Sequence, residues 1–178
     1  MKVDLSTYNN NWYKPGNPVK RILWYYVNLI FFKSGWFPFY GVKVLLLKLF
    51  GASIGSEVLI KPFVNIKYPW FLTIGDHVWI GENVWIDNLA QVTIGNNVCI
   101  SQGALLLSGN HDYKSISFDL MVSPITLEDG VWICAKAVVC SGVTCYSHSI
   151  VNAGSIATQN CEANCIYKGN PAIKIKTR

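Results

Sequence analysis

Aliphatic or small side chains recur every six residues through most of this chain. Four runs keep the period: Ile54, Ile60, Ile66, Leu72; Ile74, Ile80, Ile86, Val92; Ile94, Ile100, Leu106; and Leu127, Ile133, Val139, Cys145, Val151, Ala157, Ala163. Gly, Asp, Ser or Glu often follows the aliphatic residue, and Val or Ala often stands two places before it. The second and third runs each begin two residues late, at 74 and 94.

A period of six excludes both ordinary regular structures. An α-helix repeats every 3.6 residues and a strand every two. Six residues make a short strand and a corner, and three such units make one coil of a three-sided parallel β-solenoid, with the aliphatic residue in its core. We expect the two-residue delays, at 72 to 74 and 92 to 94, to be small loops at a corner. A β-sandwich would require alternating strands separated by turn clusters, which this pattern lacks.

Residues 1–50 do not repeat. Their apolar segments predict two short helices, 21–32 and 42–50, that cover the first coil of a solenoid spanning 51–168. Neither approaches the roughly 18 apolar residues that span a bilayer. The alternative is peripheral membrane contact through residues 20–50. In that arrangement cations would face lipid headgroups, and aromatic side chains would lie at the boundary: Lys20, Arg21, Lys33, Lys43 and Lys48, with Trp24, Tyr25, Trp36 and Phe37.

Composition narrows the class of protein. Of 178 residues only 14% are charged while 13% are aromatic, so we expect an oligomer or a membrane surface to cover part of the exterior. The net charge of +5 is concentrated at the two ends, including a basic tail at 169–178, rather than in the stripe that a nucleic-acid binder carries. The six cysteines contain no CxxC pair, which predicts reduced thiols and a cytoplasmic protein.

The repeat is interrupted from 108 to 125 by a polar segment, SGNHDYKSISFDLMVSPI. A loop of this length in a compact solenoid is usually functional. It contains His111, whereas His77 and His148 each fall at the third position after an inward residue, on the surface. An imidazole titrates near neutrality and can take a proton from a hydroxyl and return it to a leaving group, provided that a carboxylate or carbonyl fixes its other nitrogen. We predict that His111 is the catalytic base.

Residues 51–176 resemble the hexapeptide-repeat acyltransferases. The segments IGENVWIDN (80–88), IGNNVCI (94–100) and GNHDY (109–113) are similar to the acetyltransferases of colanic acid and capsule biosynthesis, relatives of the galactoside and maltose acetyltransferases. The resemblance implies a left-handed helix, a homotrimer with active sites between subunits, acetyl-CoA as donor, a carbohydrate hydroxyl as acceptor and no metal.

The resemblance also assigns residues to the two substrates. Asp87, Asn88 and Trp85 fall where that family contacts the acceptor sugar. For acetyl-CoA it implies contacts from side chains in the segments GVWICA (130–135) and NAGSIAT (152–158) and near the carboxyl end: Trp132, Ala135, Ala153, Thr158, Lys174 and Lys176. Gln159 stands where the family often has Lys, which weakens the expected phosphate contact there.

Three other functions share this pattern. The same base and donor wall would serve N-acetylation of an amino sugar or acetylation of an antibiotic, and only the acceptor pocket distinguishes them. A β-helical carbonic anhydrase would need His77 and His148 to join His111 around zinc, against their spacing. The third alternative is a non-enzymatic solenoid, either a scaffold or an ice-binding protein; ice binding would need a regular ladder of Thr on one face, and the sequence has none.

Overall fold

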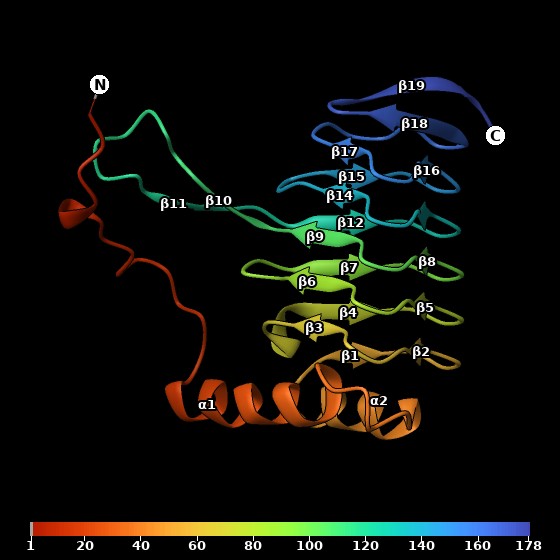
Figure 1. Ribbon diagram of the computed structural model, residues 1–178, viewed down its shortest axis with the longest axis horizontal. Helices are drawn as coiled ribbons and strands as arrows, with labels where there is room; N and C mark the ends of the chain where they lie inside the picture. The colour runs from red at the N-terminus through yellow and green to blue at the C-terminus, as the bar shows by residue number, and fades with distance from the viewer. Residues whose placement is uncertain (1) are drawn as a thin grey trace.

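A computed structural model describes residues 2–178 as a three-sided parallel β-solenoid with two short helices across one end (Figure 1). This confirms the parallel solenoid that the six-residue period predicts. Each coil contributes one strand to each of three sheets, and successive coils pair in parallel register, as Trp132 with Ile150 and Ile133 with Val151.

We call the three sheets A, B and C. Sheet A contains β1 (Ser53–Ile54), β4 (Leu72–Ile74), β7 (Val92–Ile94), β12 (Ile125–Leu127) and β15 (Thr144–Cys145). Sheet B contains β2 (Leu59–Ile60), β5 (Trp79–Ile80), β8 (Cys99–Ile100), β13 (Trp132–Ile133), β16 (Ile150–Val151) and β18 (Cys165–Gly169). Sheet C contains β3 (Asn65–Ile66), β6 (Trp85–Asp87), β9 (Leu105–Leu107), β14 (Val138–Val139) and β17 (Ile156–Ala157). β19 (Ala172–Thr177), in the predicted basic tail, pairs antiparallel with β18.

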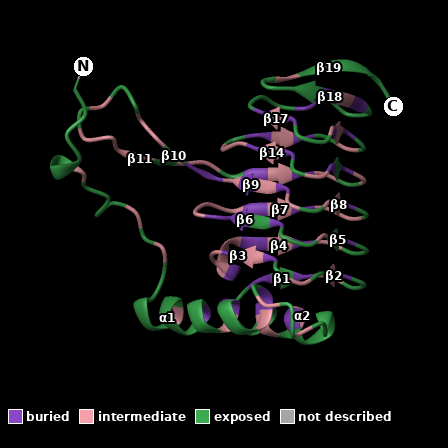
Figure 2. Ribbon diagram, viewed as in Figure 1, coloured by how far each residue is buried: buried purple, intermediate pink, exposed green. Residues whose placement is uncertain are grey.

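The inward positions of the repeat form one continuous buried column (Figure 2). Every predicted inward residue from Ile54 to Ala157 is buried. Ala163 is exposed, so the prediction is wrong there. Cys161 takes the inward place instead and pairs with Cys145, because the last corner is shorter than the earlier ones. All six cysteines are free thiols, and four are buried.

The two-residue delays have a different cause from the one we expected. Leu72 and Ile74 both point inward from a single three-residue strand, β4, and Val92 and Ile94 do the same in β7. The extra residues lie earlier, at the corner between sheets C and A. In the first of these corners the chain makes a short 3-10 turn, η3 (Pro69–Phe71).

The small residue after the inward aliphatic is required by the stacking of coils. A methyl group on Gly75 would lie 2.9 Å from the backbone carbonyl carbon of Gly95 in the next coil. Side chains one place further on tie these corners together: Asp76 accepts from Ser56 N (2.6 Å), and Asn96 accepts from Asp76 N (2.8 Å). The hydrogen bonds that the Asp76 carboxylate accepts from the backbone N–H and the hydroxyl of Ser56 lower its pKa.

Gly75→Ala should lower the free energy of unfolding by about 1–3 kcal/mol, because backbone in the adjoining coil has to move to admit the methyl group. Gly41→Ala is the matched control. A methyl group there meets nothing within 4 Å, and Gly41 lies in a helix, where Ala is preferred. Urea denaturation of both variants measures the difference, and a Gly75→Ala protein as stable as the parent would contradict the steric argument.

Two helices cover the open end of the first coil. They are α1 (Pro18–Val27), continued by the π-helical turn η2 (Asn28–Phe32), and α2 (Tyr40–Leu49). Trp24 is 2% exposed and donates from Nε1 to the carbonyl of Ile66 (2.8 Å). Lys43 is fully buried, donates to the carbonyl of Lys61 (3.1 Å), and has its pKa lowered by burial. Trp24 and Lys43 therefore face the solenoid, not lipid as the membrane alternative required.

Two further segments leave the solenoid. Residues 108–124, which we call the arm, include the antiparallel hairpin β10 (Gly109–His111) and β11 (Leu120–Val122). Residues 2–17, which we call the strap, include the short turn η1 (Leu5–Thr7) and run from α1 to the tip of the arm (Figure 1). Within residues 2–178 no helix has the length and apolar character needed to cross a bilayer.

Candidate active site

His111 ends strand β10 on the arm, and a backbone carbonyl fixes its ring. Nδ1 lies 2.9 Å from the carbonyl oxygen of Phe118. The Phe118 ring stacks on the imidazole at 4.4 Å with an interplanar angle of 7°. Since a carbonyl only accepts, Nδ1 carries the proton and Nε2 has a free lone pair. The structure thus identifies the orienting group that the sequence left open between a carboxylate and a carbonyl.

The turn that presents this carbonyl is held by its own side chains. Phe118 has a φ of 52°, in the left-handed region that few residues other than Gly adopt. Asp119 accepts from the hydroxyls of Ser115 (2.8 Å) and Ser117 (2.7 Å), which lowers the pKa of its carboxyl. The turn is therefore ordered by contacts within the arm, and it fixes the orientation of the imidazole.

The strap contacts the arm near His111. The Tyr8 ring lies 5.9 Å from the imidazole, and Asp4 N donates to the carbonyl of Ile116 at the tip of the arm (2.9 Å). Closer to the solenoid, Tyr13 donates from its hydroxyl to the carbonyl of Leu89 (2.6 Å). Our sequence analysis missed these residues, because the strap has no repeat and its contacts are far away along the chain.

Asp87 lies at the root of the arm. It ends β6, is 7% exposed, and its backbone carbonyl accepts from the Ser108 hydroxyl (2.9 Å). A methyl group on Gly109, two residues before His111, would be 3.9 Å from Asp87 Oδ2. Lys67 Nζ is 3.0 Å from Oδ1, but the same oxygen has no well-directed hydrogen bond within residues 2–178. The carboxylate is thus paired with a cation, and its Oδ1 is shielded from solvent.

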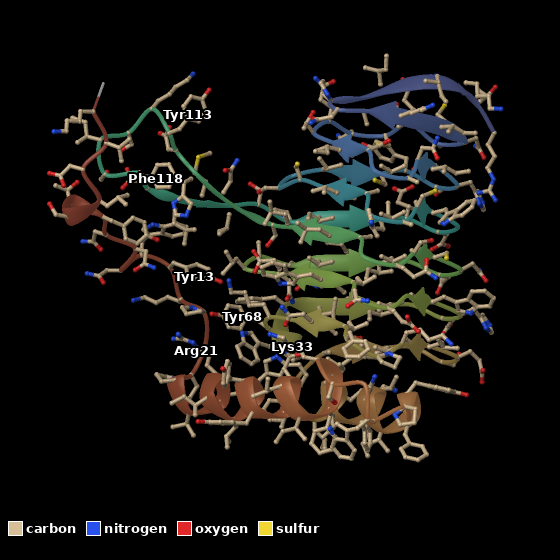
Figure 3. All side chains as sticks on the ribbon, viewed as in Figure 1. Tyr13, Arg21, Lys33, Tyr68, Tyr113 and Phe118 are labelled. Carbon is tan, nitrogen blue, oxygen red and sulfur yellow. The ribbon has the colours of Figure 1, made fainter. Side chains whose placement is uncertain are left out.

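A cavity of about 690 Å³ lies between α1 and sheet C, and Trp85 lines it. The indole is 45% exposed. Arg21, Lys33 and Lys67 bring positive charge to the same cavity, and Tyr68 adds a further aromatic wall. In Figure 3, Tyr13, Tyr68, Arg21 and Lys33 converge in this region from the strap, the solenoid and the helical end. Burial raises the pKa of Tyr13, with smaller contributions from Tyr68 and Asp87.

Asn88 is fully buried, and its side-chain amide forms hydrogen bonds with the backbone of the same chain. Nδ2 donates to the carbonyls of Tyr68 (2.6 Å) and Phe71 (3.2 Å), and Oδ1 accepts from Tyr68 N (3.0 Å). Asn88 therefore fixes the corner beside Trp85 and Asp87. A direct contact between Asn88 and the acceptor stays a prediction.

The residues predicted to bind acetyl-CoA follow one side of the solenoid. Trp132 projects from sheet B, is 43% exposed, and donates from Nε1 to the Ser101 hydroxyl (2.9 Å). Ala135 and Ala153 occupy the same corner in successive coils, linked by a hydrogen bond from Gly154 N to the Ala135 carbonyl (3.0 Å). Small side chains leave backbone groups accessible at this corner.

The remaining predicted donor contacts lie nearer the carboxyl end. Thr158 and Lys176 are exposed. Lys174 forms an ion pair with Glu162 (2.7 Å), and that hydrogen bond raises the pKa of Lys174. A phosphate that binds Lys174 would compete with Glu162, whereas Lys176 carries no ion pair within the described residues.

One subunit does not bring all of these groups together. The arm leaves the solenoid between β9 and β12, at the corner of sheets C and A, while Trp132 lies on sheet B. In Figure 1 the arm extends away from the strands of sheet B. Trp85 and Asp87 lie on sheet C and His111 on the arm, whereas Trp132 lies on sheet B, with Ala135 and Ala153 at the corner between sheets B and C.

Among the described residues, His77 and His148 do not form a metal site with His111. Both are exposed at corners between sheets A and B, far along the chain from the arm. From residue 2 to 178, no three His, Cys, Asp or Glu side chains gather closely enough to hold a metal ion.

An imidazole with one nitrogen held and the other available can accept a proton and return it, and here it stands on an arm of a parallel β-solenoid. No family model matches the sequence. The chain is 38% identical over 168 residues to the Escherichia coli (strain K12) protein named colanic acid biosynthesis acetyltransferase WcaF, covering 93% of this chain and 91% of the relative. It is 31% identical over 134 residues to the galactoside O-acetyltransferase of the same organism, covering 74% and 66%.

Solved structures agree with these relatives. A hexapeptide-repeat acetyltransferase of Vibrio cholerae superposes with a TM-score of 0.81 at 25% identity, covering 89% of this chain and 90% of the other. A galactoside acetyltransferase in complex with coenzyme A superposes with a TM-score of 0.79 at 25% identity, covering 90% and 81%. The chain belongs to the hexapeptide-repeat acetyltransferases and is an acyltransferase.

Proposed function

We propose that this protein transfers an acetyl group from acetyl-CoA to a carbohydrate hydroxyl, in the biosynthesis of an exopolysaccharide or capsule. The observation that carries the proposal is the His111 imidazole, held at Nδ1 by the Phe118 carbonyl with Nε2 free. The named relative in colanic acid biosynthesis supports the pathway class. The V. cholerae protein has also been solved in complex with acetyl-CoA, which supports the donor.

His111 supplies both proton transfers of the reaction. Nε2 accepts the proton of the acceptor hydroxyl while its oxygen bonds to the acetyl carbon, and then returns that proton to the departing sulfur of coenzyme A. The Phe118 carbonyl stabilises the imidazolium that exists between these steps, because it accepts from Nδ1–H in both protonation states.

The acceptor would lie in the cavity beside Trp85. A sugar offers an apolar C–H face, which matches the exposed indole of Trp85 in the cavity, and hydroxyl donors, which match the carboxylate of Asp87 two residues further along β6. The donor would lie along Trp132, Ala135, Ala153 and Thr158. Lys174 and Lys176 would then reach its phosphates.

We further infer a left-handed homotrimer with its active sites between subunits. The support is geometric: the arm carries His111 away from the sheet that holds Trp132, which favours a donor wall supplied by a neighbouring subunit. We place the enzyme in the cytoplasm, at the inner face of the membrane. Light scattering of the purified protein tests the assembly, and a monomer with full activity would exclude a site shared between subunits.

Thiol release from acetyl-CoA, measured against a panel of monosaccharides, oligosaccharides and amino sugars, tests the reaction itself. We expect release that depends on a carbohydrate and yields an acetyl ester identified by mass spectrometry and mild alkaline hydrolysis. An alkali-stable amide on an amino sugar would assign the N-acetyltransferase alternative. If no acceptor gives release above the rate in buffer, the proposal is wrong.

Trp132→Ala should raise the Michaelis constant for acetyl-CoA by roughly two- to ten-fold, since an aromatic contact contributes about 0.5–1.5 kcal/mol. Trp79→Ala is the matched control, because Trp79 is 63% exposed on the same sheet, nearer the helical end. Steady-state kinetics with each substrate varied in turn distinguish the two sites. A change confined to the acceptor constant would remove Trp132 from the donor wall.

A further inference from the structure

The helical end of the molecule carries an exposed apolar surface that the fold does not use. Six side chains form what we call the basal face: Ile22, Tyr26, Leu29, Trp36, Leu45 and Leu49, between 44% and 71% exposed. Ile22, Tyr26 and Leu29 follow helical spacing along α1 and η2, and Leu45 and Leu49 do so along α2. The opposite sides of the same helices bury Trp24, Lys43 and Leu47 on the solenoid. Both helices are therefore apolar on two faces, of which the solenoid covers one.

Side-by-side assembly leaves this surface uncovered. The helices lie across the lower end of the solenoid, perpendicular to the direction in which the coils stack (Figure 1). Subunits that meet through their sheets and arms, as the proposed function requires, bring their basal faces to the same end of the assembly. Figure 2 shows α1 and α2 exposed along the side that faces away from the coils. A contiguous apolar surface of this kind marks a binding site.

Charge identifies the partner. Residues 5–56 contain no Asp or Glu, and the same stretch contains Lys14, Lys20, Arg21, Lys33, Lys43 and Lys48. Of these cations only Lys43 is buried, and none takes part in an ion pair within residues 2–178. Two such faces placed against each other would bring like charges together. An anionic lipid surface instead offers an apolar interior to the leucines and negative headgroups to the lysines.

We propose that the basal face is a docking surface for an anionic bilayer, with α1 and α2 lying in the plane of the headgroups. This rests on the proposed function only for the side-by-side assembly. The acceptor cavity shares Ile22, Tyr26 and Leu29 with the basal face, so docking brings that cavity to the lipid surface. Arg21 and Lys33 line the same cavity and would face the headgroup region.

Sedimentation of the full chain with vesicles tests the docking. We expect binding to vesicles of phosphatidylcholine with phosphatidylglycerol, much weaker binding to phosphatidylcholine alone, and loss of binding at about 1 M salt. The double variant Leu45→Glu/Leu49→Glu should reduce the bound fraction at least about ten-fold, because two charges then enter the apolar layer. Ile173→Glu is the matched control, since Ile173 is 64% exposed on β19 at the other end of the solenoid.

Lys48→Gln gives an independent variant that leaves the apolar residues in place. It should weaken binding to the anionic vesicles and leave the weak binding to phosphatidylcholine unchanged. Thiol release with a soluble acceptor should be the same in all three variants and the parent, which separates a failure of docking from a failure of the proposed reaction.

Three outcomes would overturn the docking proposal. The first is that the parent protein fails to bind anionic vesicles. The second is that the double variant binds as well as the Ile173→Glu control. The third is that the mass of the assembly doubles without lipid and Leu45→Glu/Leu49→Glu abolishes the doubling, because the occupant of the basal face would then be a second copy of the protein.

Discussion

His111→Ala should lower kcat/KM for acetyl transfer by roughly two to four orders of magnitude while the protein stays folded. The imidazole is half-buried on the arm and adds nothing to the core column, so its loss removes the proton acceptor and leaves the solenoid unchanged. The fall should appear mainly in kcat, because the base acts on the transition state rather than on substrate binding. Steady-state thiol release measures it, with circular dichroism as the check on folding.

His148→Ala is the matched control for the base. His148 is exposed at a corner between sheets A and B, so its variant should turn over at the parent rate. If His111→Ala also keeps the parent rate, the assignment of the base fails, whatever the fold. A similar loss in both variants would instead point to a general effect of histidine removal on the protein.

Ile80→Ala should lower the free energy of unfolding by about 2–5 kcal/mol. Ile80 is fully buried in the core column with β2 and β8 paired on either side, and these neighbouring coils restrict collapse into the cavity that the substitution leaves. In a stacked repeat, weakening one coil also weakens its contacts with both neighbours. Equilibrium unfolding in urea measures the change.

Ile173→Ala is the control for Ile80→Ala. Ile173 is 64% exposed, so its removal should change the stability by less than about 0.5 kcal/mol. Should both variants unfold at the same urea concentration, the column of inward residues would not be the source of the stability.

The strap and the arm explain how a solenoid with a uniform wall acquires a local site. Parallel coils position backbone with high regularity, but they present the same kind of surface at each level. The arm breaks this regularity, and the strap ties its tip to the helical end through Asp4, Tyr8 and Tyr13. The strap contacts Leu89 and the root of the arm contacts Asp87, so contacts of both segments converge beside the end of β6.

The six-residue period by itself determined the parallel solenoid, its inward residues through Ala157, and the place where the arm interrupts it. It could do so because each coil stacks on a like coil, so burial at one position repeats at the next. The apolar segments near the amino end likewise predicted both helices to within three residues of their observed starts at Pro18 and Tyr40. For the solenoid, the local sequence pattern was sufficient to predict the strands, because the neighbouring backbone is another copy of the same six-residue unit.

The individual side-chain and backbone contacts of the site could be determined only from the tertiary structure. The Phe118 carbonyl reaches His111 through a turn with a left-handed residue, and Lys67 pairs with Asp87 at the same place in the next coil. The side-chain amide of Asn88 donates hydrogen bonds to the backbone carbonyls of Tyr68 and Phe71. The last inward position of the repeat is Cys161, because the corner before it is shorter than the earlier ones. The His111–Phe118 contact lies outside the repeat, and the contacts of Asp87 and Asn88 join equivalent positions of successive coils through side chains that the period does not specify, so packing and hydrogen-bond geometry in three dimensions fix them.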